Sequence, residues 1–160
     1  MKRLFLLGIV TIVTLGSCMS QSRKFDKLCQ KYEEVEGVKT FRINGLGCMF
    51  ASLFVGGEES GVENLVRSCS SCQLLIYDGT ECKELAREVK SHIHSNPLEE
   101  LMTIKEQGKE IRIYVEDRKD KIRQFFITVM DGPKTVVIHL QGKFSRNKIQ
   151  KLMASVSEIK

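Results

Sequence analysis

IRIYVEDRKDKIRQFFITVMDGPKTVVIHLQ, residues 111–141, is the stretch that decides the fold of this chain. Apolar and polar side chains alternate over residues 111–116 and again over 136–141, which is the period of a β-strand with one buried face. Between them, residues 122–130 are apolar in both phases, as expected of a strand with neighbours on both sides. The two connections are short and rich in Asp and Gly, which favours antiparallel pairing. The stretch therefore predicts a three-stranded meander.

Helical and strand patterns extend on both sides of this meander. A single apolar face that includes Phe25, Leu28 and Tyr32 predicts a helix over residues 22–35, ended by Gly37. Further helices are predicted over 46–55, over 81–94 with Thr80 as the cap, over 97–107 between Asn96-Pro97 and Gly108, and from Ser145 onward, and further strands over 38–43 and 72–77.

These elements predict an α+β domain with a mainly antiparallel sheet that ends in the meander, and with helices packed on one face. Ile113, Ile127 and Ile138 belong to the apolar phase of their strands and are expected to face a common core. Residues 18–160 fit the size of one domain, and no repeat or proline-rich linker divides them.

The first 18 residues have the layout of an export signal. Lys2 and Arg3 precede an apolar run of about a dozen residues, which is shorter than the roughly 20 needed to span a bilayer. The run ends in Leu15-Gly16-Ser17-Cys18, which resembles a bacterial lipobox. We expect residues 1–17 to be a signal peptide and Cys18 to carry acyl chains such as palmitate. A plain signal peptide with an incidental cysteine and an uncleaved anchor are the alternatives.

The charge pattern excludes one class of partner. The formal net charge is +5, or +3 without Lys2 and Arg3, and acidic residues are interleaved with basic ones throughout. No basic stripe is reserved for phosphates, so nucleic acid is not an expected partner. No phosphate loop, nucleophile elbow, H-E-x-x-H helix or dinucleotide fingerprint occurs, so the sequence predicts no cofactor and no catalytic residue.

The chain contains six cysteines, of which five remain if Cys18 is acylated. Cys69 and Cys72 have the C-x-x-C spacing of thiol oxidoreductases, in which the first cysteine lies at a helix N-terminus and its thiolate is stabilised there. Here the pair precedes a predicted strand. We therefore expect Cys69 and Cys72 to form a structural disulfide or to be buried thiols, and retain redox catalysis as an alternative.

The same cysteines also raise the question of a metal site. Cys69, Cys72 and Cys82 with His92 or His94 could supply four zinc ligands, but such sites usually carry two paired knuckles. The sequence therefore predicts no metal. His139 lies in the opposite phase from Ile138 and Leu140, as a surface or sheet-face residue rather than a base.

The half of the chain from Leu98 onward resembles the bacterial family called domain of unknown function 4252, and the resemblance extends over nearly the whole of residues 18–160. The resemblance is carried by Leu101-Met102, by Gly108 and by Ile138-His139-Leu140-Gln141-Gly142, and earlier by Glu36-Gly37-Val38. It implies a helix leading through a glycine into three strands and a closing helix, together with an export signal. The family has no assigned activity, and the stretch from Cys69 to Cys82 is outside its pattern.

The leading functional hypothesis is a non-enzymatic bacterial cell-envelope lipoprotein, tethered on the periplasmic side through Cys18, that binds an envelope protein partner. The alternative is a thiol-disulfide active periplasmic protein that uses Cys69 and Cys72. A third interpretation is a sheet-face pocket for a small apolar ligand near Phe126, Met130 and Val137.

Overall fold

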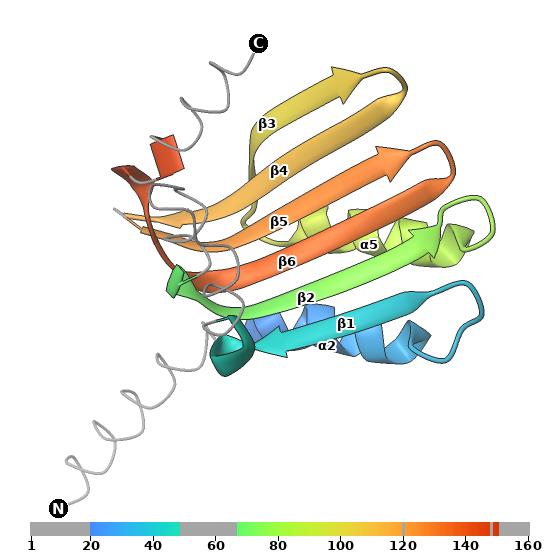
Figure 1. Ribbon diagram of the computed structural model, residues 1–160, viewed down its shortest axis with the longest axis horizontal. Coiled ribbons are helices and arrows are strands. Elements are labelled where there is room, and N and C mark those ends of the chain that lie inside the picture. The colour runs from blue at the N-terminus through green and yellow to red at the C-terminus, as the bar shows by residue number, and fades with distance from the viewer. Residues whose placement is uncertain (1–19, 49–66, 120, 148, 151–160) are drawn as a thin grey trace, which may run out of the picture.

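The computed structural model describes residues 20–48, 67–119, 121–147 and 149–150. The predicted signal peptide, Cys18 and most of the predicted helix over 46–55 lie outside these residues. Six strands form one antiparallel sheet in the order β1-β2-β6-β5-β4-β3 (Figure 1). Their bounds are β1 Lys39–Asn44, β2 Cys69–Asp78, β3 Glu99–Glu106, β4 Lys109–Arg118, β5 Lys121–Asp131 and β6 Lys134–Ser145.

The α+β class is confirmed, and the run of consecutive antiparallel strands contains four members, from β3 to β6. The strands expected over residues 111–141 are β4, β5 and β6. The additional strand β3 pairs with β4 through a tight turn at Gln107 and Gly108, whose φ values are 48° and 84°. Two successive residues with positive φ are the signature of a type I′ hairpin, which matches the twist of the strands.

The helix predicted over 97–107 is wrong, because those residues form β3 and its turn. Asn96 was interpreted as the cap of a new helix, but it ends the preceding one. Its backbone is extended and its side-chain Nδ2 donates to the carbonyl oxygen of His92. Gly108 was interpreted as a helix stop, but it supplies the left-handed position of the hairpin turn.

β2 lies in the interior of the sheet, between β1 and β6. It joins two strands that are far apart in the sequence, because β6 begins 90 residues after the end of β1. Its continuous apolar run is explained by burial on both faces of the sheet. The strand is longer than predicted, so that Cys69 and Cys72 both lie within β2 and not ahead of it. The two strands at the edges of the sheet are β1 and β3, and most side chains of both are exposed.

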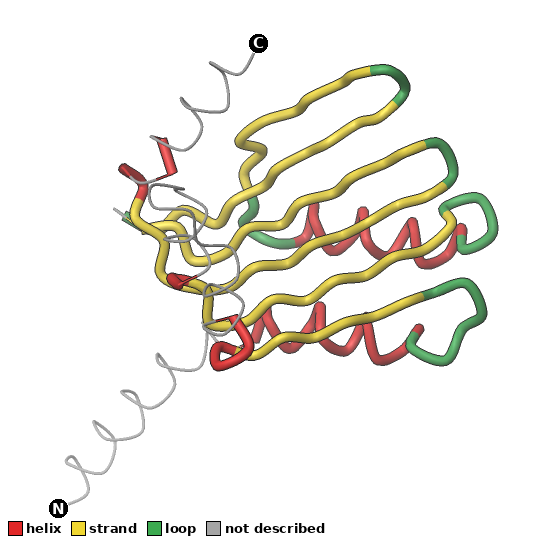
Figure 2. The backbone as a smooth tube through the Cα atoms, in the orientation of Figure 1, coloured by secondary structure: helices red, strands yellow, loops and turns green. Residues whose placement is uncertain are grey.

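Two helices, α2 (Ser20–Tyr32) and α5 (Lys83–Ser95), lie on the same side of the sheet (Figures 1 and 2). Asp78, and not Thr80, organises the start of α5, because its Oδ1 accepts from the backbone N–H groups of Thr80 and Glu81. Apolar side chains from both helices and the sheet form what we call the helix-side core. It consists of Phe25, Leu28, Cys29, Tyr32, Val38, Leu75, Tyr77, Leu85, Val89, Ile93, Phe126 and Val137.

The opposite face of the sheet is apolar as well. Ile113, Ile127 and Ile138 are direct register partners, so they share this face as expected, although each is only half-buried. Ile113 and Ile127 pack against a second core. Its described members are Cys48, Cys69, Val115, Ile122, Phe125, Phe144 and Ile149. In the part of the chain that the structure describes, no helix has the length and apolar character needed to span a membrane.

Candidate functional site

Cys69 and Cys72 lie together with Cys48 at one end of the second core. Cys48 is 4% exposed and Cys69 is 8% exposed, while Cys72 packs against the same cluster from the third position after Cys69. The Cys69 thiol donates to the carbonyl oxygen of Ser71 across 3.0 Å. All five described cysteines are free thiols in this structure. Cys69 and Cys72 are therefore packed side chains here and are not joined to each other.

Burial makes these thiols poor nucleophiles. It raises the pKa of Cys69 to about 12, with Cys48 and Cys72 adding to the effect, and it raises the pKa of Cys72 as well. In the helix-side core, burial raises the pKa of Cys29 to about 12. Since the thiolate is the reactive form, a raised pKa leaves little of it at neutral pH.

The residues weighed as zinc ligands lie on different faces of the sheet. Cys82 packs on the helix-side core, whereas Cys69 and Cys72 belong to the second core. His92 is tilted against the rings of Phe25 and Phe126, and His94 is exposed. Among residues 20–48, 67–119 and the later described ranges, no three His, Cys, Asp or Glu side chains are grouped so that they could hold a metal ion.

A chain of polar side chains crosses the sheet beneath the helices, and we call it the polar row. It links five strands and α2 through side-chain hydrogen bonds and one longer contact. Its members are Arg42 on β1, Asp26 on α2, Gln73 on β2, His139 on β6, Gln124 on β5, and Glu116 with Arg118 on β4. Its inner residues Gln73, Gln124, Glu116 and His139 are all buried.

The ends of the polar row are charged and its centre is neutral. Arg42 donates to Asp26 at 2.9 Å, and Arg118 donates to Glu116 at 2.7 Å. Each carboxylate also accepts from a glutamine amide, Gln73 at one end and Gln124 at the other, both at 2.7 Å. Because these amides donate outward, their oxygens point inward, toward the residue between them.

That central residue is His139, which is 1% exposed. Its Nε2 lies 2.7 Å from Gln124 Oε1 and its Nδ1 lies 3.4 Å from Gln73 Oε1. The short contact fits an N–H that donates, and the long one fits a bare nitrogen facing an oxygen. We therefore assign the neutral tautomer with its proton on Nε2. Both ring nitrogens face protein atoms, so the imidazole has no room to accept a proton from a substrate.

Burial lowers the pKa of His139 to about 4, and the nearby His92 lowers it further. Burial also lowers the pKa of His92 to about 4, assisted by the charge of Lys24. His139 was expected at a surface or sheet face, and it lies on the covered face. The buried partners Gln73, Gln124 and Glu116 were not predicted, although Gln124 shares the strand phase of Phe126 and so could have been placed inward.

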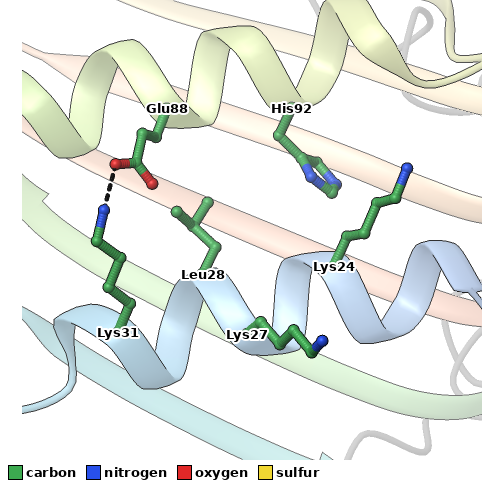
Figure 3. A pocket seen from close by; sticks show the side chains of 6 residues that line it. All are labelled: Lys24, Lys27, Leu28, Lys31, Glu88 and His92. Atoms are coloured by element: carbon green, nitrogen blue, oxygen red, sulfur yellow. Dashed lines mark hydrogen bonds and ion pairs between the residues drawn. The ribbon is translucent and has the colours of Figure 1, made fainter.

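The outer surface between α2 and α5 holds an open pocket of about 290 Å³ (Figure 3). Lys24, Lys27 and Lys31 line it from α2, and Glu88 and His92 line it from α5. Lys31 Nζ lies 2.6 Å from Glu88 Oε1 and bridges the helices, while Leu28 forms the floor between them. A second pocket of about 240 Å³ lies between α2 and β1, beside Asp26 and Arg42 at the end of the polar row.

The third interpretation is a sheet-face pocket near Phe126, Met130 and Val137. Met130 is half-buried, but Phe126 and Val137 do not fit such a pocket. Both side chains are buried in the helix-side core, where Phe126 meets Phe25 edge to face at 4.9 Å between ring centroids. They fill the space under the helices and cannot line a groove for a ligand.

Comparison with known proteins gives a family. No curated protein matches this chain. The model of the family described as domain of unknown function (DUF4252) matches residues 32–152, a range that begins at the end of α2 and contains all six strands. The matched part exceeds half of the chain, and it contains every member of the polar row except Asp26. This chain therefore belongs to the DUF4252 family.

Proposed function

We propose that this chain is a bacterial cell-envelope lipoprotein whose domain acts by binding another envelope component, without catalysis. The observation that carries the proposal is Leu15-Gly16-Ser17-Cys18 at the end of a basic and then apolar leader. The first described helix, α2, starts at Ser20, two residues after Cys18 in the sequence. Two or more acyl chains on Cys18 would hold the domain at the membrane surface permanently, whereas one chain would bind only marginally.

The chemistry of the described site supports a binding role rather than catalysis. The imidazole of His139 is enclosed, with both ring nitrogens facing glutamine side-chain oxygens. The thiols of Cys29 and Cys69 have raised pKa values because they are buried. A nucleophile or a general base has to reach its substrate, and burial prevents this for all three groups. The two thiols are in addition protonated, and so unreactive, at neutral pH.

Changing Cys18 to serine tests the anchor. We expect the unchanged protein to begin at an acylated Cys18 and to fractionate with membranes. Cys18→Ser removes the thiol that accepts the lipid, so the chain should either remain unprocessed or appear in the soluble fraction. Cys29→Ser is the matched control and should leave the membrane fraction unchanged. An intact mass that places an unlipidated N-terminus at any residue other than 18 would contradict the proposal.

The alternative function is a thiol-disulfide active protein centred on Cys69 and Cys72. One observation favours it, namely the third thiol, Cys48, in contact with Cys69. The position of the pair opposes it. Both cysteines lie in β2, and among the described residues no helix begins at either of them to lower its thiol pKa.

Alkylation of the reduced, folded protein separates these two functions. We expect Cys29, Cys69 and Cys72 to react slowly at pH 7, because burial raises the pKa of all three thiols. Mass spectrometry of peptides after timed alkylation between about pH 4 and pH 9 gives the rate at each thiol, with the denatured chain as the reference. A thiol at position 69 or 72 that titrates below about pH 6.5, well under the ordinary value near 8.5, would favour the thiol enzyme.

A further inference from the structure

The two helices of the outer layer carry more positive charge than the rest of the domain. α2 has four basic side chains and one acidic one, and α5 has three basic and two acidic, so the two helices together carry +4. Residues 18–160 as a whole carry +3. The sheet, its loops and the remaining residues therefore contribute no net positive charge, and the imbalance is confined to the helix layer.

Within the layer, the positive charge gathers at the end nearest Cys18. Contacts between Lys31 and Glu88 and between Phe25 and His92 show that α5 runs antiparallel to α2. The last turns of α5 therefore lie beside the first turns of α2. This end of the layer carries three exposed basic side chains of α2, which we call the basic patch: Arg23, Lys24 and Lys27.

The acidic residues near the basic patch are already engaged. Asp26 accepts from Arg42 and Gln73 in the polar row, and Glu88 is paired with Lys31. In the described structure neither Lys24 nor Lys27 has an ion-pair partner. The next acidic side chains after α2 are Glu33 and Glu34, which follow the opposite end of the helix.

The basic side chains at the start of α2 do not stabilise the helix itself. The first turn of α2 contains no acidic residue and carries Arg23. A helix N-terminus bears a partial positive charge, so cations there are unfavourable and anions are favourable. At 100° per residue, Arg23, Lys24, Lys27 and Lys31 fall within an arc of about 100°, turned away from the buried Phe25 and Cys29. The arc therefore presents one continuous cationic surface that an external anion would compensate.

We propose that the basic patch is a docking surface for the anionic lipid headgroups of the membrane, on which the helix layer rests. The proposal builds on the proposed lipoprotein function, because α2 begins two residues after Cys18. An anchor at that position brings the basic end of the layer within a Debye length of the headgroups, about 10 Å at moderate salt. The lipid anchor then fixes the location of the domain, and the basic patch fixes which face it turns to the membrane.

Vesicle binding without the acyl group tests the surface directly. The probe is the mature chain from residue 18 with Cys18→Ser, sedimented with vesicles of phosphatidylglycerol and phosphatidylcholine or of phosphatidylcholine alone. We expect binding only to the anionic vesicles, and loss of that binding when salt rises from about 0.1 M to about 1 M. Lys24→Gln with Lys27→Gln should lower the partition coefficient by about 25-fold, since each basic residue contributes about fivefold.

The matched control removes the same charge at the far edge of the sheet. Lys105→Gln with Lys109→Gln alters the β3–β4 hairpin, where both lysines are exposed and form only surface ion pairs. We expect a much smaller loss of binding, because these side chains lie farther than a Debye length from the bound lipid. All the altered side chains are exposed, so circular dichroism should show the same fold in both variants.

Three results would overturn the proposal. One is equal binding to neutral and anionic vesicles, and another is an equal loss in the two double variants. The third is binding to soluble poly-glutamate but not to anionic vesicles, which would assign the patch to an acidic protein partner. The outcome is independent of the lipoprotein test, because the probe carries no acyl chain. Failure of acylation is detected by intact mass, and failure of the basic patch is detected by sedimentation.

Discussion

Replacing Phe126 with alanine is expected to lower the free energy of unfolding by about 3–5 kcal/mol. Phe126 is 1% exposed and lies where α2, α5 and the sheet meet. Its ring contacts Phe25 edge to face at 4.9 Å and lies 5.5 Å from the ring of His139. The loss of stability combines the transfer free energy of the ring with the cost of the cavity that it leaves, because the surrounding helices and strands cannot collapse into that cavity. Urea unfolding followed by circular dichroism measures it.

Two other phenylalanines provide the controls. Phe41 on β1 is 54% exposed, so Phe41→Ala should cost no more than about 1 kcal/mol. Phe125 is the neighbour of Phe126 but faces the second core, where it meets Phe144 edge to face. Phe125→Ala should be nearly as destabilising as Phe126→Ala if both faces of the sheet unfold together. Equal effects at positions 126 and 41 would show that the helix layer is not docked as described.

Acidification is expected to destabilise the domain through the buried His139 and the half-buried His92. Burial lowers the pKa of His92 and His139 to about 4, from 6.5 in the unfolded chain. Between these two values the unfolded state binds more protons than the folded state. The stability that the two neutral imidazoles contribute is therefore fully present above pH 6.5 and is lost as the pH falls toward 4. The shift of each histidine corresponds to about 3 kcal/mol over this window.

The slope of the unfolding free energy against pH isolates this effect. Each histidine adds at most about 1.4 kcal/mol per pH unit, whereas the carboxylates contribute equally in every variant. His139→Gln should remove one such contribution to the slope between about pH 6.5 and pH 4.5. This expectation holds even if the variant is less stable than the unchanged protein at pH 7. His92→Gln should do the same from a less buried position. An unchanged slope in both variants would mean that these imidazoles can become protonated in the folded protein.

The strands over residues 111–141 were predictable because periodicity 2 and short turns are local signals. β3 was not, because Leu98 to Glu106 is composed of good helix formers, and only pairing with β4 makes it a strand. Asn96-Pro97 does mark the boundary of a helix, but the boundary is the end of α5 and not the start of the predicted helix. An asparagine side chain can satisfy the start of a helix or the end of one, and only the position of α5 decides between them.

The candidate site was harder to predict than the fold. The C-x-x-C spacing of Cys69 and Cys72 can be recognised in the sequence. The face of the sheet on which they lie depends on the register of β2, which is set by its pairing with the neighbouring strands. The polar row was invisible for the same reason. Gln73 and His139 are 66 residues apart in the sequence and become direct neighbours only when β2 pairs with β6. Long-range pairing of this kind leaves no local pattern in a single sequence.

The two edge strands have a consequence for a population of these molecules. Exposed edges invite pairing between copies, and tethering many copies to one surface strengthens any weak contact between them. β1 carries Lys39 and Arg42, whereas β3 carries three glutamates and one lysine. Either symmetric dimer, edge β1 on β1 or β3 on β3, would place like charges opposite each other. Identical edges therefore repel, whereas β1 of one copy and β3 of another carry opposite net charge, so any self-association of these sheets is expected to join unlike edges.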